Sequence, residues 1–205
     1  MAKAIFLGSF NPPHKGHYNC IKSFIDSGFM EEHNIDKIHI IPCYQNPNKQ
    51  KYTVPFYYRY KMCCEMFRDL ILDDKVLIDD IENNIEPQYT FDLIKYFKSN
   101  EDGFIKDDFY WIITTETLKE IIDGKWFRWT DLLDDNKFIV MYEDNGQKPI
   151  CDINMYPIPL KENVSIHSTQ IREKVKNGES IINETNDNVQ KYILEKDLYN
   201  RICYT

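Results

Sequence analysis

The sequence has no excess of basic residues. Lysine and arginine together number 25 against 33 acidic residues, which gives a formal net charge of −8 at pH 7. The isoelectric point is about 5.2. A general nucleic-acid-binding protein usually presents a basic face, so we expect no nucleic-acid partner, while a local basic pocket is still compatible with this balance.

Cysteines in a metal-ligating or disulfide pattern are also absent. The six cysteines show no C-x-x-C spacing, and Cys63 and Cys64 are adjacent. This usage is typical of reduced thiols in a cytosolic protein, not of a zinc site or a disulfide framework. We therefore expect a cytoplasmic protein without a metal site built from its own side chains.

Long apolar runs are missing as well. None approaches the roughly 18 residues that a membrane helix needs, and the first residues lead into a strand pattern rather than a signal peptide. What the chain does have is 42% hydrophobic and 14% aromatic residues over 205 positions. That is enough for a real core, so we expect one domain over residues 1–205 and no membrane partner, with a homo-oligomer left open.

The most informative stretch is GSFNPPHKGH, from Gly8 to His17. An apolar run at 4–7 precedes it and an apolar helical face at 20–25 follows, which predicts a strand, a tight loop and a helix. Such a loop offers backbone N–H groups and a helix N-terminus to phosphate, and His14 and His17 can donate hydrogen bonds without a fixed charge. Gly and Pro after a strand often form only a turn, but the combination favours a phosphate site.

Strand and helix patterns alternate through the rest of the chain. A second strand at 37–41 completes a strand–helix–strand unit, so we expect parallel strands. A long helix follows Pro55, with one apolar stripe from Phe56 to Ile71, and a closing helix covers 187–196. Further strands are predicted at 76–78, 109–113, 138–141 and 155–158.

Three segments between these elements carry candidate binding residues. Lys49 and Lys51 in the polar loop 42–53 are either solvated or in reach of phosphate. Arg59 lies off the apolar stripe of its helix, where it is either solvated or bound to a substrate phosphate. Thr90 is placed to N-cap a helix, which is a sufficient structural role, although a helix N-terminus can also receive a carboxylate or phosphate.

A second anion site is predicted near the end of the chain, in SIHSTQIR from Ser165 to Arg172. Ser168 can N-cap a helix that runs to about Asn177, and Arg172 lies one turn along on the same face. An N-cap alone is commonplace. The added arginine and the matching site at the start of the chain favour polyphosphate binding.

These motifs resemble those of the nicotinate (nicotinamide) mononucleotide adenylyltransferases, above all the bacterial nicotinate-type branch of the nucleotidyltransferases with an H-x-G-H signature. The likeness covers nearly the full length: Gly8 to His17 is similar to the ATP loop, Ile166 to Arg172 to the I-S-S-T-x-I-R motif, and Lys125 to Trp129 to a substrate-binding segment. The resemblance implies an α/β fold, a Rossmann-like parallel sheet with helices on both faces and a C-terminal helical segment.

The resemblance also implies roles for individual residues. The catalytic set would be His14, His17 and Arg172, and Mg²⁺ would be bound mainly through substrate and water. In the family, the tryptophan at Trp126 stacks on the pyridine ring, and the backbone amides at Thr90 and Phe127 face the nicotinate carboxylate. The expected contacts with ATP are Gly8, Ser9, Phe10, Gly16, Ser168 and Thr169. The expected contacts with the mononucleotide substrate, which accepts the adenylyl group, are Asn11, Arg59, Thr90, Glu116, Trp126 and Phe127.

The chain departs from the family pattern at three places. It has Thr114-Thr115-Glu116 where the family usually has G-x-D, Asn11 where the family has Asp, and His167 where the family has Ser. The changes at Thr114 and Glu116 affect the expected ribose contacts, and the carboxylate of Glu116 is retained but is one methylene longer. None removes a group that the chemistry strictly requires.

The implied reaction joins nicotinate mononucleotide to the AMP part of ATP and releases pyrophosphate. The attacking phosphate is already largely ionised at pH 7, because its second pKa is about 6, so no general base is needed. Three alternatives stay open: the amide mononucleotide as acceptor, phosphopantetheine as acceptor, and a non-catalytic nucleotide sensor. Thr90 at a helix start favours the acid over the amide, since a carboxylate needs only donors.

Overall fold

Six parallel strands form one sheet in the computed structural model of the chain, which describes residues 2–46, 54–87, 89–99, 109–145, 148–149, 152–163 and 165–200. The strand order is β3-β2-β1-β4-β5-β6, and each neighbouring pair is parallel. The strands are β1 (Ala2–Gly8), β2 (Ile35–Pro42), β3 (Val76–Ile78), β4 (Phe109–Thr114), β5 (Lys137–Glu143) and β6 (Met155–Leu160).

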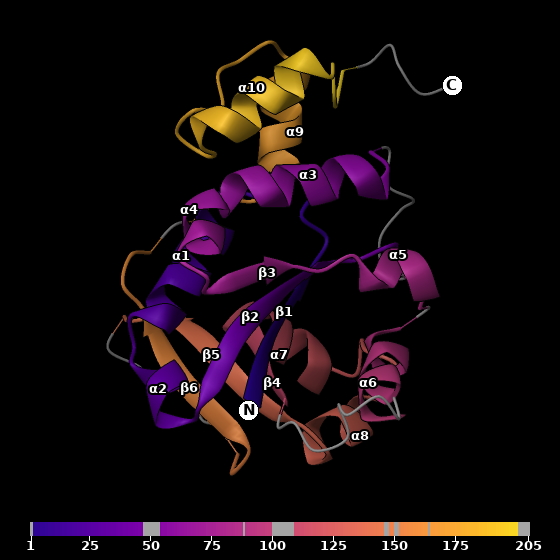
Figure 1. Cartoon of the computed structure of the whole chain (residues 1–205), viewed down its shortest axis with the longest axis vertical. Helices are drawn as coiled ribbons and strands as arrows, with labels where there is room; N and C mark the ends of the chain where they lie inside the picture. The colour runs from indigo at the N-terminus through magenta and orange to yellow at the C-terminus, as the bar shows by residue number, and fades with distance from the viewer. Residues whose placement is uncertain are drawn as a thin grey trace.

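Helices cover both faces of this sheet (Figure 1). Successive residues of a strand point to opposite faces, so Ala4 and Phe6 of β1 enter one core while Ile5 enters the other. The helices are α1 (Lys15–Ile25), α2 (Phe29–Glu32), α3 (Phe56–Met66), α4 (Arg68–Leu72), α5 (Ile81–Ile85), α6 (Thr90–Ser99), α7 (Thr115–Ile122), α8 (Trp129–Asp134), α9 (Ser168–Lys176) and α10 (Asp187–Glu195).

The two cores divide the helices between them. The first core takes residues from α1 to α4, α9 and α10, and the second takes residues from α6, α7 and α8. The predicted Rossmann-like α/β fold with a C-terminal helical segment is therefore confirmed. In a sheet of this order, successive strands are added on one side of β1 up to β3 and on its other side from β4, and ligands bind beyond the carboxyl ends of the strands at this switch point between β1 and β4.

Several predicted element boundaries were wrong. The sequence pattern predicts that the first helix ends near Gly28, but it ends at Ile25, and Gly28 with φ 78° precedes the separate short helix α2. The single long helix after Pro55 is two helices, α3 and α4, that meet at Phe67. The predicted N-caps Thr90 and Ser168 are instead the first residues of α6 and α9.

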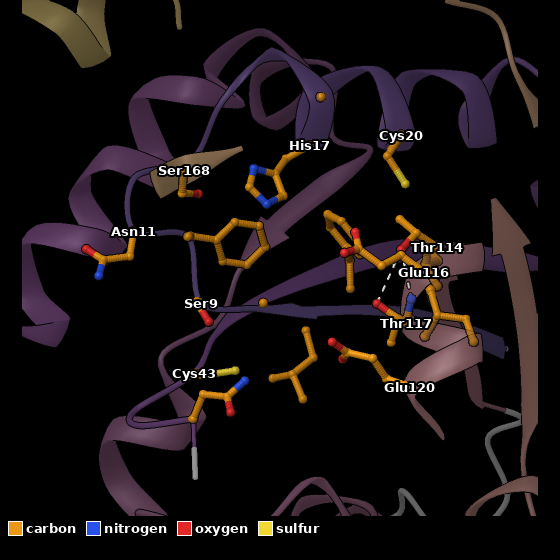
Figure 2. Close-up of a pocket in the computed structure, with 18 of the residues that line it drawn as sticks. Ser9, Asn11, His17, Cys20, Cys43, Thr114, Glu116, Thr117, Glu120 and Ser168 are labelled. Carbon is orange, nitrogen blue, oxygen red and sulfur yellow. Dashed lines mark hydrogen bonds between the residues drawn. The ribbon is translucent and has the colours of Figure 1, made fainter. Parts of the chain in front are cut away.

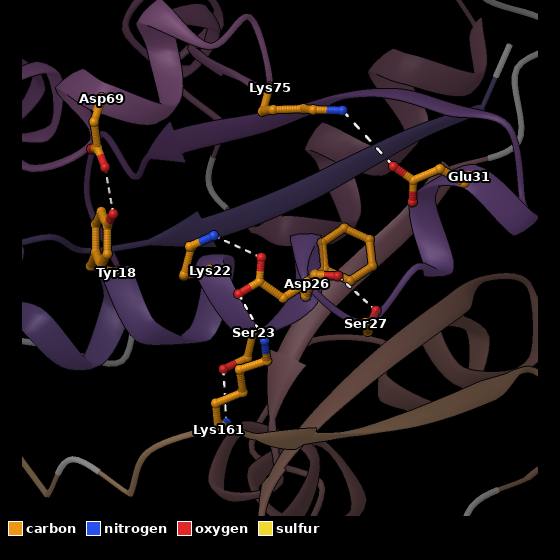
Figure 3. A network of polar contacts seen from close by, with 10 residues as sticks. Tyr18, Lys22, Ser23, Asp26, Ser27, Glu31, Asp69, Lys75 and Lys161 are labelled. Atoms are coloured by element: carbon orange, nitrogen blue, oxygen red, sulfur yellow. Dashed lines mark hydrogen bonds and ion pairs between the residues drawn. The ribbon is translucent and has the colours of Figure 1, made fainter.

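A network of polar contacts fastens α1 to the end of β6 (Figure 3). Asp26 accepts hydrogen bonds from Lys22 Nζ at 2.7 Å and from Lys161 Nζ at 3.0 Å. These bonds, the one from Lys22 first, lower the pKa of Asp26. Ser23 Oγ accepts from the Lys161 N–H at 3.0 Å.

Over the described ranges, no helix combines the length and hydrophobicity that crossing a bilayer requires.

Candidate active site

A pocket of about 1550 Å³ lies at the carboxyl ends of β1 and β4. It takes its walls from the loop after β1, the start of α1, the loop after β2, the first turn of α7 and the start of α9. The volume exceeds the roughly 300–1,000 Å³ that is usual for one small ligand, so it has room for two nucleotides. The expected site residues that line it are Gly8, Ser9, Phe10, Asn11, His14, Gly16, His17, Thr90, Glu116, Trp126, Ser168, Thr169 and Arg172.

The loop between β1 and α1 has a compact, constrained backbone. Phe10 adopts a left-handed φ of 43°, and its side chain is buried against Phe6 and His17 instead of facing a ligand. A Cβ on Gly8 would lie 2.9 Å from the Phe10 ring, so only glycine fits there. Phe10 therefore shapes the loop with its ring, and only its backbone can serve the site.

The two histidine rings of the loop lie against each other, with centroids 3.7 Å apart and the ring planes tilted by 36°. The backbone N–H of His14 donates to Nδ1 of His17 at 3.2 Å. Because Nδ1 is the acceptor, the neutral ring of His17 carries its proton on Nε2. Figure 2 shows the His17 ring directed from the start of α1 into the pocket, which makes this Nε2–H a hydrogen-bond donor for a bound ligand.

His14 is neutral in this environment. Burial lowers its pKa from 6.5 to about 3, and repulsion from nearby His167 contributes to the shift. Its ring atom Nδ1 is buried and has no hydrogen-bond partner within the described ranges. A neutral imidazole with unused hydrogen-bonding capacity can meet a phosphate oxygen with an N–H donor, without adding a net charge to the pocket.

The start of α9 closes over the same loop. Ser168 Oγ donates to the Pro12 carbonyl at 2.9 Å, which explains why Ser168 does not cap its helix and His167 occupies the N-cap position. Arg172 donates from Nη1 to the Asn11 carbonyl at 2.8 Å and from Nη2 to Thr169 Oγ1 at 3.1 Å. The two predicted anion sites thus form one continuous surface.

The predicted contact of Arg59 with substrate does not fit its position. The side chain is 1% exposed and is absent from the pocket lining. Its guanidinium donates to four backbone carbonyls, those of Ser9, Cys43, Tyr44 and Val54, at 2.6 to 3.2 Å. Arg59 therefore holds the loops after β1 and β2 together instead of reaching a ligand.

Across the pocket, Trp126 and Thr90 contribute to the wall. Trp126 Nε1 is buried and has no hydrogen-bond partner in the described part of the chain. The side chain of Phe127 does not line the pocket: it is 49% exposed and stacks on Tyr89, with centroids 4.5 Å apart. That stacking connects the Trp126 loop to the residue before α6.

Two carboxylates extend from α7 towards the loop that carries Ser9 (Figure 2). Glu116 and Glu120 lie one helical turn apart, so both face the pocket. Thr114 N-caps this helix, because its Oγ1 accepts from the Thr117 N–H at 3.3 Å. The departure at 114–116 therefore keeps an oxygen acceptor, Glu116, at the place where the family pattern has Asp.

Sequence reasoning missed several residues that line the pocket, notably Glu82, Glu120 and Tyr199. Glu82 is 3% exposed and accepts from the Tyr44 N–H at 2.6 Å. Burial raises its pKa to about 7, against the opposing effects of that hydrogen bond and of Arg59. No motif marks Glu82 or Tyr199, which come from elements distant from the β1–α1 loop, whereas Glu120 follows Glu116 by one helical turn, a spacing that could have indicated it. Lys49 and Lys51 lie outside the described residues.

The arrangement is suited to aligning phosphate groups. Backbone N–H groups, two imidazoles and an arginine converge from the starts of α1 and α9. Over the ranges that the structure describes, no three His, Cys, Asp or Glu side chains are grouped so that they could hold a metal ion. The Cys20 thiol, which lines the pocket, is not activated as a nucleophile, because burial raises its pKa to about 12.

Comparison with known proteins identifies relatives along the whole chain. The Cytidylyltransferase-like family matches residues 5–174. A protein of Fusobacterium nucleatum that is named "Probable nicotinate-nucleotide adenylyltransferase" is 34% identical and is aligned over 96% of this chain and 98% of its own. One from Pseudothermotoga lettingae is 27% identical over 93% and 94% of the two chains.

Among solved structures, the nicotinic acid mononucleotide adenylyltransferase of Plasmodium falciparum has the same fold. Its complex with APC superimposes with a TM-score of 0.76 at 20% identity, over 97% of this chain and 96% of the other. Its complex with NaAD gives a TM-score of 0.75.

Proposed function

The chain belongs to the Cytidylyltransferase-like family and, within it, to the nicotinate-nucleotide adenylyltransferases; from this premise we propose how its pocket carries out the reaction. The reaction transfers the adenylyl group of ATP to nicotinate mononucleotide, and it yields nicotinate adenine dinucleotide and pyrophosphate. The chain is thus a nucleotidyltransferase of NAD biosynthesis.

One observation supports this assignment more than any other. A single pocket brings together the two predicted anion sites, Gly8 to His17 and Ser168 to Arg172, and a separate wall with Trp126 and Thr90. An enzyme that joins two nucleotides needs both parts in one cavity. A protein that only senses ATP has no need for the aromatic wall.

The reaction is a displacement at the α-phosphorus of ATP. The phosphate of the mononucleotide attacks, the bond to the bridging oxygen of pyrophosphate breaks, and pyrophosphate leaves with that electron pair. The attacking phosphate is ionised at neutral pH, so no base has to remove a proton. The enzyme's work is to bring two anions together and to stabilise the charge that develops on the transferred and leaving phosphates.

His14 and His17 are proposed to donate hydrogen bonds to the phosphates at the reacting centre. The Nε2–H tautomer of His17 supports this role, because its other nitrogen already accepts from the His14 backbone. The low pKa of His14, about 3, means that its ring remains a neutral donor across the physiological range. Neutral donors stabilise developing charge in the transition state without holding the ground-state phosphates too tightly.

Ser168, Thr169 and Arg172 are proposed to hold the β- and γ-phosphates of ATP at the start of α9. The first N–H groups of a helix have no partner within the helix, and its dipole favours an anion at that end. Arg172 is already orientated by its bonds to Asn11 and Thr169. It can therefore bind a phosphate with little further loss of side-chain freedom. Mg²⁺ is proposed to enter with ATP, held by phosphate oxygens and water.

The acceptor is proposed to bind with its pyridine ring against Trp126 and its carboxylate near the first N–H groups of α6. Thr90 is the first residue of that helix, and the Asp92 carboxylate already accepts from the Tyr89 N–H at 3.0 Å. The Asp92 and Leu93 N–H groups donate to the Tyr89 carbonyl, so the N–H groups of Thr90 and Phe91 are the donors left for a ligand in the described part of this turn. Because this end of the site offers donors, it favours the acid over the amide.

Replacing His17 tests the proposal. We expect His17→Ala to lower the turnover of ATP with nicotinate mononucleotide by at least a hundredfold, since it removes a donor at the reacting centre. Product is measured by chromatography of nicotinate adenine dinucleotide, and folding by circular dichroism. Full activity in a folded His17→Ala protein would exclude the loop from the reaction.

A further inference from the structure

We infer that Tyr199, near the C-terminus, is a positioning residue of the ATP site that acts through Asn11. Its hydroxyl donates to Asn11 Oδ1 at 2.8 Å, and both residues line the pocket. This inference rests on the proposed assignment of ATP to the loop between β1 and α1. Tyr199 lies beyond residues 5–174, which the family match covers.

The contact is buried and well defined. Tyr199 is 4% exposed and Asn11 is 8% exposed. The preceding residue, Leu198, is fully buried in the first core, which anchors the C-terminal turn beneath the loop. The hydroxyl is therefore presented by a rigid part of the fold.

The loop depends on such contacts, because distant side chains fix its backbone. Arg59 binds the Ser9 carbonyl, Arg172 binds the Asn11 carbonyl and Ser168 binds the Pro12 carbonyl. Tyr199 binds the side chain of Asn11 through its hydroxyl. Together they fix the segment between the Gly8 turn and His14, and with it the N–H groups that face a phosphate.

The bond to Tyr199 also sets the orientation of the Asn11 amide. With Oδ1 engaged by the hydroxyl, the NH₂ group is the end of the amide that is left to meet a phosphate oxygen. Without that bond the amide could turn its oxygen towards the phosphates, which would repel them. This inference assigns the Asn11 amide to the ATP phosphates, where the family resemblance implies a contact with the mononucleotide substrate, and Tyr199 fixes which end of the amide faces them.

Removing the hydroxyl alone tests this inference. Tyr199→Phe keeps the ring and leaves a buried acceptor without its donor, so we expect about a five- to fiftyfold rise in the Kd for MgATP. The Kd is measured by calorimetry on the full chain, which keeps the test independent of turnover. We expect KM for ATP to rise more than KM for the acceptor, a split that general destabilisation would not produce.

Tyr110→Phe is the matched control. Tyr110 is also 4% exposed, and its hydroxyl bonds His33 Nδ1 at 3.2 Å, but it does not line the pocket. We expect this variant to bind MgATP within about twofold of the unaltered protein, as a distant site should. Unchanged affinity in Tyr199→Phe would overturn the inference, whether or not the protein transfers adenylyl groups to nicotinate mononucleotide.

A double-mutant cycle separates action through Asn11 from a general effect. In an Asn11→Ala background we expect Tyr199→Phe to change the Kd by less than about twofold, because the acceptor is already gone. If the fold-changes in Kd of the two single variants instead multiply in the double variant, Tyr199 does not act through Asn11. Should Tyr199→Phe fail to fold at the assay temperature, Asn11→Leu removes the acceptor instead, and a Kd equal to that of the unaltered protein would then refute the inference.

Discussion

Replacing His14 by glutamine should make the protein more resistant to acid. His14 has a pKa of about 3 in the native state, because its ring is buried, and about 6.5 when the chain is unfolded. At a pH between these two pKa values, the imidazole of His14 binds a proton in the unfolded state and does not bind one in the native state. The free energy of unfolding therefore falls as the pH falls through 6.5, and His14→Gln removes this contribution.

The size of the effect follows from the two pKa values. At pH 5 the imidazole is almost fully protonated in the unfolded state and almost fully neutral in the native state. This pH lies about 1.5 units below the unfolded-state pKa of 6.5. At 1.36 kcal/mol per unit, His14 lowers the free energy of unfolding by about 2 kcal/mol between pH 8 and pH 5. The same group contributes almost nothing above pH 8.

Urea denaturation at pH 8 and pH 5 measures this difference. For each protein the change in unfolding free energy between the two pH values is taken, and the change for His14→Gln is subtracted from that of the unaltered chain. This double difference cancels any destabilisation that is independent of pH. A value near zero would show that His14 is protonated normally in the native state, and the neutral-donor role would have to be abandoned.

Two further substitutions test the aromatic wall and the buried arginine. Trp126→Ala should raise KM for nicotinate mononucleotide about tenfold, because a stacked ring loses its partner, with a smaller effect on KM for ATP; steady-state kinetics with each substrate varied in turn measure both. Equal effects on both KM values would place Trp126 outside the acceptor site. Arg59→Met should lower the free energy of unfolding by about 3–5 kcal/mol, since it breaks four buried hydrogen bonds and leaves Glu82 without a nearby positive charge. A urea midpoint within error of the unaltered protein would contradict the proposed clamp between the loops.

The parallel sheet could be predicted from the sequence because its strands are short apolar runs in alternation with amphipathic helices. The phosphate loop and the start of α9 could be predicted because each concentrates its chemistry within ten residues. Local patterns of this kind can be recognised in the sequence alone. The start of a helix cannot be predicted to within one residue in this way, as Thr90 and Ser168 demonstrate.

Arg59 shows why the rest of the site could not be predicted. Its place at the start of a helix near the ligand side suggested a phosphate contact. Its donors are instead taken by carbonyls of Ser9, Cys43, Tyr44 and Val54, which come together only when the sheet forms. An arginine at a loop junction satisfies buried carbonyls as readily as it binds substrate, and sequence spacing does not distinguish the two.

Tyr199 and Glu82 illustrate the same limit from the other side. Neither belongs to a motif, and each reaches the pocket from an element far along the chain from the β1–α1 loop. Tyr199 donates a hydrogen bond to the Asn11 side chain, and Glu82 accepts one from the Tyr44 N–H. Such contacts are set by the packing of distant segments, so only the structure reveals them.

The central claim is that this pocket adenylylates the acid form of a pyridine mononucleotide. Pyrophosphate release from MgATP, measured in parallel with nicotinate mononucleotide and nicotinamide mononucleotide, tests it most directly. We expect release with the acid and a kcat/KM at least tenfold lower with the amide, since the backbone groups left for a ligand at the start of α6 are N–H donors. Equal rates would contradict the recognition of the carboxylate, and no release with either acceptor would contradict the proposed reaction.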